Sequence, residues 1–336
     1  MKVTGNNYDI GYQIGSHFKL NIRNILSELE EFKKHKISYP ENKVYLSQMV
    51  AISKKICPEI LEEVQGMADG SGLEFIDLFI HNSRHMPYWS NCSTSVLRED
   101  AIHIVHNEDA HPIFEKYAYF VLIQPKNPKS IPFFSHCYPG IIPGMSFGFN
   151  MMGLVQTCNA LPDPTKSVGL PRMFVGRTIY EKSKTITDAI HIIAAMKPRS
   201  GGASYTLCTL SEQNIVNVET TGTDFAVIPI KTRFFRANHY ISEKFKHFPA
   251  ASEHTLRRQR RGDELLPKIH NSKELVQIMR DKSIHLTMES TNNECQTNAL
   301  LHFKITQYNI EVKIFPEFSV QSHLVLDLEK LKSDKV

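Results

Sequence analysis

The stretch Trp89-Ser90-Asn91-Cys92-Ser93-Thr94-Ser95 marks the point at which the character of the chain changes. Before it, apolar residues recur every three or four positions, and those from Ile10 to Phe32 form one apolar stripe, which is typical of helices. After it, runs rich in β-branched and aromatic residues alternate with turn residues such as Asp100 and Gly140, which is typical of strands. The sequence therefore predicts a helical N-terminal segment followed by a strand-rich α+β region with largely antiparallel pairing.

The spacing of apolar residues also predicts the individual elements. Pro58 suits the first turn of a helix that stops at Gly70 and Gly72. The chain shows no internal repeat and no low-complexity linker, so we expect one compact domain, with a frayed charged tail at 328–336. Helical patterns cover 10–32, 44–56, 58–69, 73–81, 173–183, 186–196, 253–266 and 273–279. Strands are predicted at 93–97, 101–107, 117–123, 131–136, 146–149, 153–159, 204–210, 214–220, 225–230 and 234–238, and a final hairpin at 300–305 and 310–315.

The composition excludes several classes of protein. Hydrophobic residues make up 41% and charged residues 22% of the 336 residues, which indicates a folded chain. Lys and Arg number 39 against 35 Asp and Glu, and a net charge of +4 is too small and too evenly spread to predict nucleic-acid binding. No apolar run approaches the roughly 20 residues of a transmembrane helix, and the N-terminus has no apolar signal-peptide core. We therefore expect a cytoplasmic protein without a nucleic-acid or membrane partner.

The six cysteines never occur at CxxC spacing, so a disulfide framework and a structural zinc site are not expected. The 16 histidines form no HExxH or HxH pair, and no GK[ST] follows the turn Ser200-Gly201-Gly202. We therefore expect no metal and no cofactor. The remaining question is whether one cysteine is a nucleophile.

Seven segments along the chain are similar, in the same order, to motifs of one family. They are Gly5-Asn6-Asn7-Tyr8-Asp9-Ile10-Gly11-Tyr12-Gln13-Ile14-Gly15, Glu63-Val64-Gln65-Gly66-Met67-Ala68-Asp69-Gly70-Ser71-Gly72-Leu73, Cys92-Ser93-Thr94-Ser95, Asn107-Glu108-Asp109, Gly148-Phe149-Asn150-Met151-Met152-Gly153-Leu154 with Thr157-Cys158-Asn159-Ala160-Leu161, Gly169-Leu170-Pro171-Arg172 and Asn238-His239-Tyr240. In these segments the chain resembles the acyl-coenzyme A:6-aminopenicillanic acid acyltransferase family, a branch of the N-terminal-nucleophile (Ntn) hydrolases. The resemblance implies one domain, 1–336, folded as a four-layer αββα sandwich with two stacked, mainly antiparallel sheets.

The resemblance further implies that the chain is an inactive precursor that cuts itself between Asn91 and Cys92. A helical fragment, 1–91, and a catalytic fragment, 92–336, would stay associated as a heterodimer, with higher oligomers also compatible. Cys92 would then attack a small non-peptide amide or an acyl thioester such as an acyl-coenzyme A, and pass the acyl group to water or to an amine. The chemistry is plausible because a thiol has a pKa of about 8.5 and an α-amino group one of about 7.7–8. The new amino group of Cys92 can take the thiol proton, so no separate histidine is needed.

Four more residues are expected in the site from the same resemblance. Asn238 and Asn159 match positions that donate to the oxyanion or orient the site, and an oxyanion needs such fixed donors. Asp109 matches the acceptor for the new ammonium group of Cys92. Arg258 resembles an arginine of the related choloylglycine hydrolases that lies near the nucleophile, where it would lower the thiol pKa. The run of arginines at 257, 258, 260 and 261 leaves its position uncertain by one residue.

Two departures from the family pattern leave alternatives open. The family usually has glycine before the nucleophile, where this chain has Asn91, and His106 stands where the choloylglycine branch has arginine. One alternative is a thiol hydrolase that works without cleavage, with His239 or His106 as the base of Cys92. Another is a non-catalytic binding protein on the same scaffold. The remaining cysteines, Cys295 among them, are expected to be packing residues.

Overall fold

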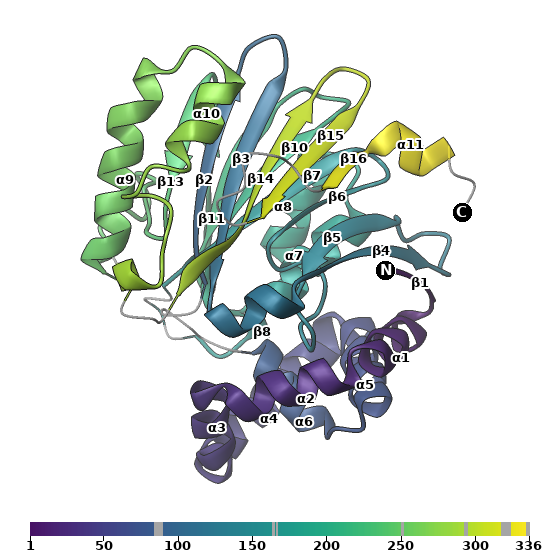
Figure 1. Cartoon of the computed structure of the whole chain (residues 1–336). Coiled ribbons are helices and arrows are strands. Elements are labelled where there is room, and N and C mark those ends of the chain that lie inside the picture. Colours follow the sequence, from purple (N-terminus) through teal and green to yellow (C-terminus); the bar gives the residue numbers. More distant parts are fainter. Residues whose placement is uncertain are drawn as a thin grey trace.

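The computed structural model describes residues 1–83, 90–162, 165, 167–249, 252–291, 295–316 and 324–333. Two stacked sheets form its centre (Figure 1). Sheet A has the order β1 (Lys2–Gly5), β4 (Tyr119–Pro125), β5 (Phe133–Cys137), β6 (Phe147–Asn150), β7 (Leu154–Leu161), β10 (Gly202–Thr209), β11 (Ile215–Thr220) and β12 (Phe225–Pro229). Sheet B has the order β13 (Arg233–Arg236), β2 (Ser90–Arg98), β3 (Ile102–Ala110), β14 (Gln296–Ile305), β15 (Ile310–Pro316) and β16 (Leu324–Asp327). Within both sheets the pairs are antiparallel except β1 with β4, which confirms the predicted α+β class and its stacked sheets.

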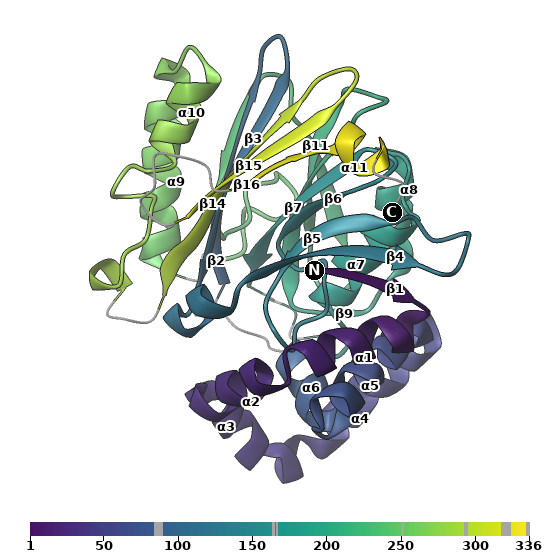
Figure 2. The same ribbon diagram turned by 45° about the vertical axis from the view of Figure 1, so that its right-hand side comes forward.

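Helices cover the outer face of each sheet, so that the order of layers is helix, sheet, sheet, helix (Figure 2). α7 (Arg172–Lys182) and α8 (Ile186–Ala195) pack against sheet A, whereas α9 (Glu253–Leu265) and α10 (Ser272–Ile278) pack against sheet B. The N-terminal helices gather at one end of the sandwich: α1 (Asn7–His17), α2 (Lys19–Glu28), α3 (Glu30–Ile37), α4 (Tyr39–Ile56), α5 (Pro58–Ser71) and α6 (Phe75–Asn82). Smaller elements are β8 (Leu170–Pro171), β9 (Arg199–Ser200), α11 (Leu328–Ser333) and the 3-10 turns Pro112–Tyr117, Leu266–Lys268 and Glu289–Thr291. Among the described residues, no helix combines the length and the apolar character needed to cross a bilayer.

The layer between the two sheets is apolar over most of its extent. Val96 and Ile104 of sheet B meet Phe147, Phe149 and Val155 of sheet A there. Successive residues of a strand point to opposite faces, so each of these strands gives every second side chain to the layer. Towards the N-terminal end of β2, the side chains that point into this layer become polar or nucleophilic. The candidate site therefore lies between the two sheets.

Two predictions about the helices were wrong in detail. The apolar stripe at 10–32 is buried as expected, but it is divided among α1, α2 and α3, because Phe18 and Leu29 leave the helical conformation. The tail predicted to fray is helical over Leu328–Ser333, because Leu328 is buried in the core between the sheets. Residues 334–336 and Trp89 lie outside the described residues.

The glycines of the two N-terminal motifs bring α1 and α5 into backbone contact. A Cβ atom added to Gly11 would lie 2.0 Å from the carbonyl oxygen of Glu63. One added to Gly66 would lie 2.1 Å from the carbonyl oxygen of Tyr8. Real Cβ atoms do not approach backbone oxygens so closely, so only glycine allows this crossing. These motif glycines therefore serve the packing of α1 against α5.

We expect Gly66→Ala to lower the free energy of unfolding by about 1–3 kcal/mol, because the added methyl group forces α1 away from α5. The midpoint of urea denaturation measures the effect. Glu62→Ala, at an exposed position of the same helix, is the control and should stay within about 0.5 kcal/mol of wild type. Equal midpoints for the two variants would contradict the close helix crossing.

Candidate active site

The hairpin of β2 and β3 determines which side chains meet around Cys92. Cys92 is 2% exposed and lies opposite Glu108, while Asn91 lies opposite Asp109. Residues directly opposite each other in an antiparallel ladder point to the same face, and chain neighbours point to opposite faces. Cys92 and Glu108 therefore point into the layer between the sheets. Asn91 and Asp109 point toward the layer of α9 and α10.

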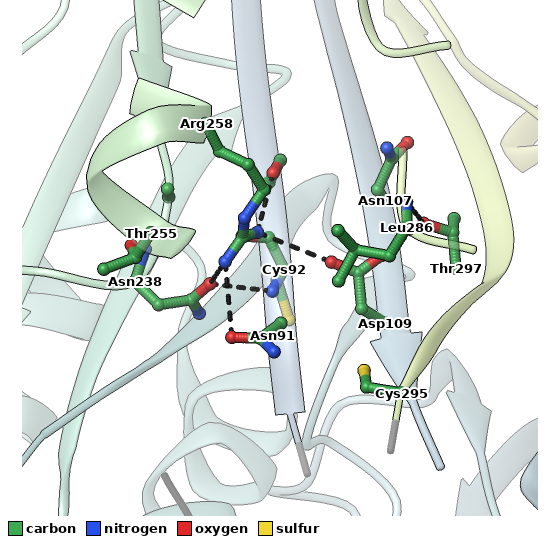
Figure 3. A network of polar contacts seen from close by, with 12 residues as sticks. Asn91, Cys92, Asn107, Asp109, Asn238, Thr255, Arg258, Leu286, Cys295 and Thr297 are labelled. Carbon is green, nitrogen blue, oxygen red and sulfur yellow. Dashed lines mark hydrogen bonds and ion pairs between the residues drawn. The ribbon is translucent and has the colours of Figure 1, made fainter. Parts of the chain in front are cut away.

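Arg258 of α9 binds the main chain at Cys92 from the face of β2 that points toward α9 and α10 (Figure 3). Its Nη1 donates to the carbonyl oxygen of Cys92 and to the hydroxyl of Ser93, each at 3.0 Å. Its Nη2 donates to Oδ1 of Asn91 at 3.2 Å and to Oδ1 of Asn238 at 2.7 Å. The guanidinium group thereby fixes the segment on both sides of the Asn91–Cys92 peptide bond.

The structure also shows which arginine of the run at 257, 258, 260 and 261 reaches Cys92. Arg258 is fully buried, whereas Arg257 and Arg260 are exposed and Arg261 pairs with Asp281. The buried residues of α9 are Thr255, Arg258 and Gly262, spaced by three and four positions, which places them on one face of the helix. Arg258 is thus the arginine of the run that reaches Cys92.

Asp109 is buried behind Arg258. One carboxylate oxygen lies 3.5 Å from Nη1 of Arg258, and the other accepts a hydrogen bond of 2.6 Å from the hydroxyl of Thr297 on β14. Burial raises the pKa of Asp109 to about 7, although Arg258 and the Thr297 hydroxyl both favour the ionised form. Cys295, expected to be a packing residue, is buried near this pair (Figure 3).

Asn238 binds the backbone nitrogen of Cys92. Its Oδ1 accepts a hydrogen bond of 3.0 Å from the Cys92 N–H, and its Nδ2 donates to the carbonyl of Ala160 at 2.9 Å. Its own N–H donates to the hydroxyl of Thr255 at 2.7 Å, which ties it to α9. In the intact chain, therefore, the nitrogen that cleavage would turn into an amino group is bound by Asn238, and Asp109 instead faces Arg258.

Asn159 lies on β7 of the opposite sheet. Its Oδ1 accepts a hydrogen bond of 2.7 Å from the hydroxyl of Thr94, which is two residues beyond Cys92 on the same face of β2. Its Nδ2 is buried and has no hydrogen-bond partner among the described residues. A buried donor without an acceptor is costly, so this amide is available to an oxygen that arrives with a substrate.

The thiol of Cys92 faces a carboxylate and an imidazole inside the layer between the sheets. Its Sγ lies 3.8 Å from Oε2 of Glu108. Burial, and then the negative charges of Glu108 and Asp109, raise the pKa of the Cys92 thiol well above its ordinary value. The thiol is therefore neutral in the intact chain at pH 7, and any attack by it needs a base.

The two histidines considered as that base differ in position. His239 bonds to the hydroxyl of Thr255 at 3.1 Å, and burial together with the charges of Arg236 and Arg258 lowers its pKa to about 4. His106, opposite Thr94 on β3, has a ring nitrogen within 4.8 Å of both the Cys92 sulfur and a Glu108 oxygen. Of the two, His106 is the histidine near the thiol.

Cys92, His106 and Glu108 also offer one metal-ligand atom each, all within 4.8 Å of one another and all buried. A thiolate, an imidazole and a carboxylate are ligands that Zn²⁺ accepts. A Zn²⁺ ion bound there would occupy the sulfur lone pair that a nucleophile needs.

We therefore expect micromolar Zn²⁺ to inhibit whatever reaction Cys92 performs, and EDTA to restore the rate. The test measures the initial rate with and without the metal. His106→Gln removes one ligand, so it should raise the Zn²⁺ concentration for half-inhibition by on the order of 10-fold. Inhibition that is equally strong in this variant would contradict binding at the three residues.

Sequence reasoning missed Glu108 as a site residue, together with Thr297. It also missed Ser146 and Tyr138, whose hydroxyls donate to the carboxyl group of Glu108. One signal could have revealed Glu108. The hairpin turns at Asp100, so residues equally distant from Asp100 face each other, and Cys92 pairs with Glu108. Ser146, Tyr138 and Thr297 come from other parts of the chain, and no local pattern connects them to Cys92.

Comparisons with known proteins show to which family the chain belongs. A sequence model of the acyl-coenzyme A:6-aminopenicillanic acid acyl-transferase family matches residues 96–313, which begin just after Cys92 and include the other four candidate residues. The chain is also similar to the beta-alanyl-dopamine/carcinine hydrolase of Drosophila melanogaster, with 27% identity over 214 residues. That match covers 56% of this chain and 55% of the relative, so the chain spans about half the length of the curated relative it matches. Because the family match covers more than half of its residues, the chain belongs to the acyl-coenzyme A:6-aminopenicillanic acid acyl-transferase family.

Proposed function

We propose that this protein is a self-cleaving cysteine amidohydrolase or acyltransferase of the Ntn type, in which Cys92 is the nucleophile. The precursor is cut at Asn91–Cys92 into the associated fragments 1–91 and 92–336. One observation supports this most strongly: buried side chains bind both main-chain polar atoms of Cys92. Asn238 accepts from its N–H and Arg258 donates to its carbonyl, while its thiol points into the layer between the sheets.

The proposed cleavage step uses these contacts. The Cys92 sulfur attacks the carbonyl carbon of Asn91, the C–N bond to Cys92 breaks, and the nitrogen takes the thiol proton. A thioester then links Asn91 to the sulfur until water hydrolyses it to the Asn91 carboxylate and a free thiol. Asn238 binds the departing nitrogen of Cys92, and Arg258 binds the carbonyl oxygen of the same residue.

The catalytic cycle repeats the same chemistry on a substrate. The free amino group of Cys92 takes the thiol proton, the sulfur attacks the substrate carbonyl, and the proton passes to the leaving amine. Water or a second amine then removes the acyl group from Cys92. Nδ2 of Asn159, which has no hydrogen-bond partner among the described residues, is the first candidate donor for the oxyanion, and Asn238 is the second. Arg258 positions Asn91 and Ser93 from the side of β2 that faces α9, and Asp109 pairs with Arg258.

The substrate class is a small amide or an acyl thioester. The Drosophila relative is named for hydrolysis of beta-alanyl-dopamine, so a β-alanyl amide of an aromatic amine is the first substrate to test. One observation favours a second mechanism, in which the uncleaved chain acts as a thiol hydrolase with His106 as base: the ring of His106 lies within 4.8 Å of the thiol and of Glu108. Activity of a full-length chain would distinguish this alternative from the self-cleaving enzyme.

Alkylation tests the role of Cys92. The protein is incubated with iodoacetamide, the modified cysteine is identified by peptide mass spectrometry, and release of dopamine from β-alanyl-dopamine is followed. All six cysteines are buried, so a reagent that enters as a substrate does should modify Cys92 first. We expect loss of activity in proportion to modification of Cys92. Full activity with Cys92 completely alkylated would refute the proposal.

A further inference from the structure

Glu108 differs from the other buried carboxylates of the described chain in its charge partner. Five carboxylates are buried, and in four of them an arginine lies within ion-pair distance. Among the ion pairs of the described residues, none joins Glu108 to an arginine or a lysine; its one ion-pair partner is His106, at 3.5 Å. The four paired cases are Glu63 and Glu181 with Arg177, Asp109 with Arg258, and Glu219 with Arg236.

Hydroxyl groups surround the carboxyl group of Glu108. The hydroxyl of Ser146 donates to Oε2, and that of Tyr138 to Oε1 at 3.5 Å. Neither contact supplies a positive charge. Within the part of the chain that the structure describes, Glu108 is therefore a buried carboxyl group without an arginine or lysine partner.

His106 lies beside this carboxyl group. Its Nδ1 bonds to the hydroxyl of Thr94 at 2.8 Å, and its Nε2 lies 3.5 Å from Oε2 of Glu108. Glu108 and His106 therefore lie together at the Cys92 sulfur.

The position of Glu108 relative to the nucleophile fixes which part of a substrate could reach its carboxyl group. Oε2 of Glu108 lies 3.8 Å from the sulfur that would carry the acyl group. The carbonyl carbon of that group is one bond from the sulfur, so Glu108 is within reach of a group on the first or second carbon beyond it. The leaving amine departs from the other side of the carbonyl.

From this arrangement we infer that Glu108, with His106 and Ser146, is a binding subsite for the ammonium group of an α- or β-aminoacyl substrate. The inference rests on the proposed function, since it places the subsite relative to acyl-Cys92. The ammonium group donates to the carboxylate of Glu108 and places a permanent positive charge beside it. A neutral acyl chain of the same shape leaves Glu108 buried without a charge partner and is selected against.

The test compares two substrates with the same leaving amine, β-alanyl-dopamine and butanoyl-dopamine, in which a methyl group replaces the ammonium group. We expect kcat/KM of the wild-type enzyme to favour the β-alanyl substrate by about 100-fold or more. In Glu108→Gln this ratio should fall to within about 10-fold of unity. Each ratio is measured within one protein, so it does not depend on the fraction of active enzyme. Glu99→Gln, in the turn of the same hairpin, is the control and should keep the wild-type ratio.

The outcomes separate the subsite from the proposed function. Equal hydrolysis of the two substrates by the wild type, or an unchanged ratio in Glu108→Gln, overturns the subsite and leaves Cys92 as the nucleophile. A wild-type enzyme that hydrolyses neither substrate overturns the proposed function and the subsite with it. The wild-type comparison decides the question even where the Glu108→Gln chain does not fold.

Discussion

Replacing Cys92 with alanine is expected to leave an intact 336-residue chain and to abolish amide hydrolysis, with a loss on the order of 10⁴-fold or more. Both effects have one cause, because the same sulfur attacks the Asn91 carbonyl in the precursor and the substrate carbonyl in the mature enzyme. Cleavage is read by denaturing electrophoresis and activity by release of the amine. The side chain removed is small and buried, so the fold should survive.

Cys208→Ala is the matched control for this prediction. Cys208 is also a free, buried cysteine, but it lies on β10 in the apolar part of the layer between the sheets. We expect this variant to be cleaved and active at the wild-type level, with a stability cost of about 1 kcal/mol. A Cys92→Ala chain that is cleaved at Asn91–Cys92, or that retains amide hydrolysis, would show that another group is the nucleophile.

Arg258→Leu is expected to have the second-largest effect, because it removes the group that joins five residues around the cleavage site. The variant leaves the buried carboxylate of Asp109 without its counterion, which costs about 3–5 kcal/mol. It also frees the carbonyl of Cys92 and the amide of Asn238 from their donor. We therefore expect a lower Tm and little or no cleavage, measured by thermal denaturation and electrophoresis.

Two further variants separate charge from geometry at this position. Arg258→Lys keeps the charge but loses the two-pronged donor, so we expect it to recover part of the stability and little of the cleavage. Arg257→Ala removes the exposed neighbour on the same helix and should behave as wild type. Wild-type stability and complete cleavage in Arg258→Leu would mean that the contacts around Asn91 and Cys92 are dispensable.

Most of the strands could be predicted from the sequence, because their apolar residues alternate and glycine, proline or aspartate ends each run. The hairpin of β14 and β15 is one example, since 300–305 and 310–315 fall within the observed strands. The N-terminal helices were harder. A stripe of period 3.6 continues from Ile10 to Phe32 even though the chain bends at Phe18 and Leu29, because all of it packs against the same core. Periodicity reports which side chains are buried, but it does not report where a helix turns.

The motifs predicted which residues meet at the candidate site better than they predicted how these residues are arranged. Cys92, Asn238, Arg258 and Asp109 were all proposed from motifs, and the structure brings them together. Motifs do not specify which face of a strand a residue occupies. Asp109 and Glu108 are adjacent in the chain, but one pairs with Arg258 behind the main chain and the other faces the thiol. Which of these two carboxylates faces the thiol depends on how β2 pairs with β3. For this reason the motifs did not reveal the position of Glu108.

Self-cleavage at Asn91–Cys92 is the central claim, and the intact mass of freshly purified wild-type protein tests it most directly. We predict two chains of 91 and 245 residues (336 − 91 = 245) that co-purify, the larger with Cys92 as its first residue by N-terminal sequencing. Cys92→Ala, purified in parallel, should give one uncut chain. A wild-type protein that remains one 336-residue chain and nevertheless hydrolyses the amide at full rate would contradict the claim.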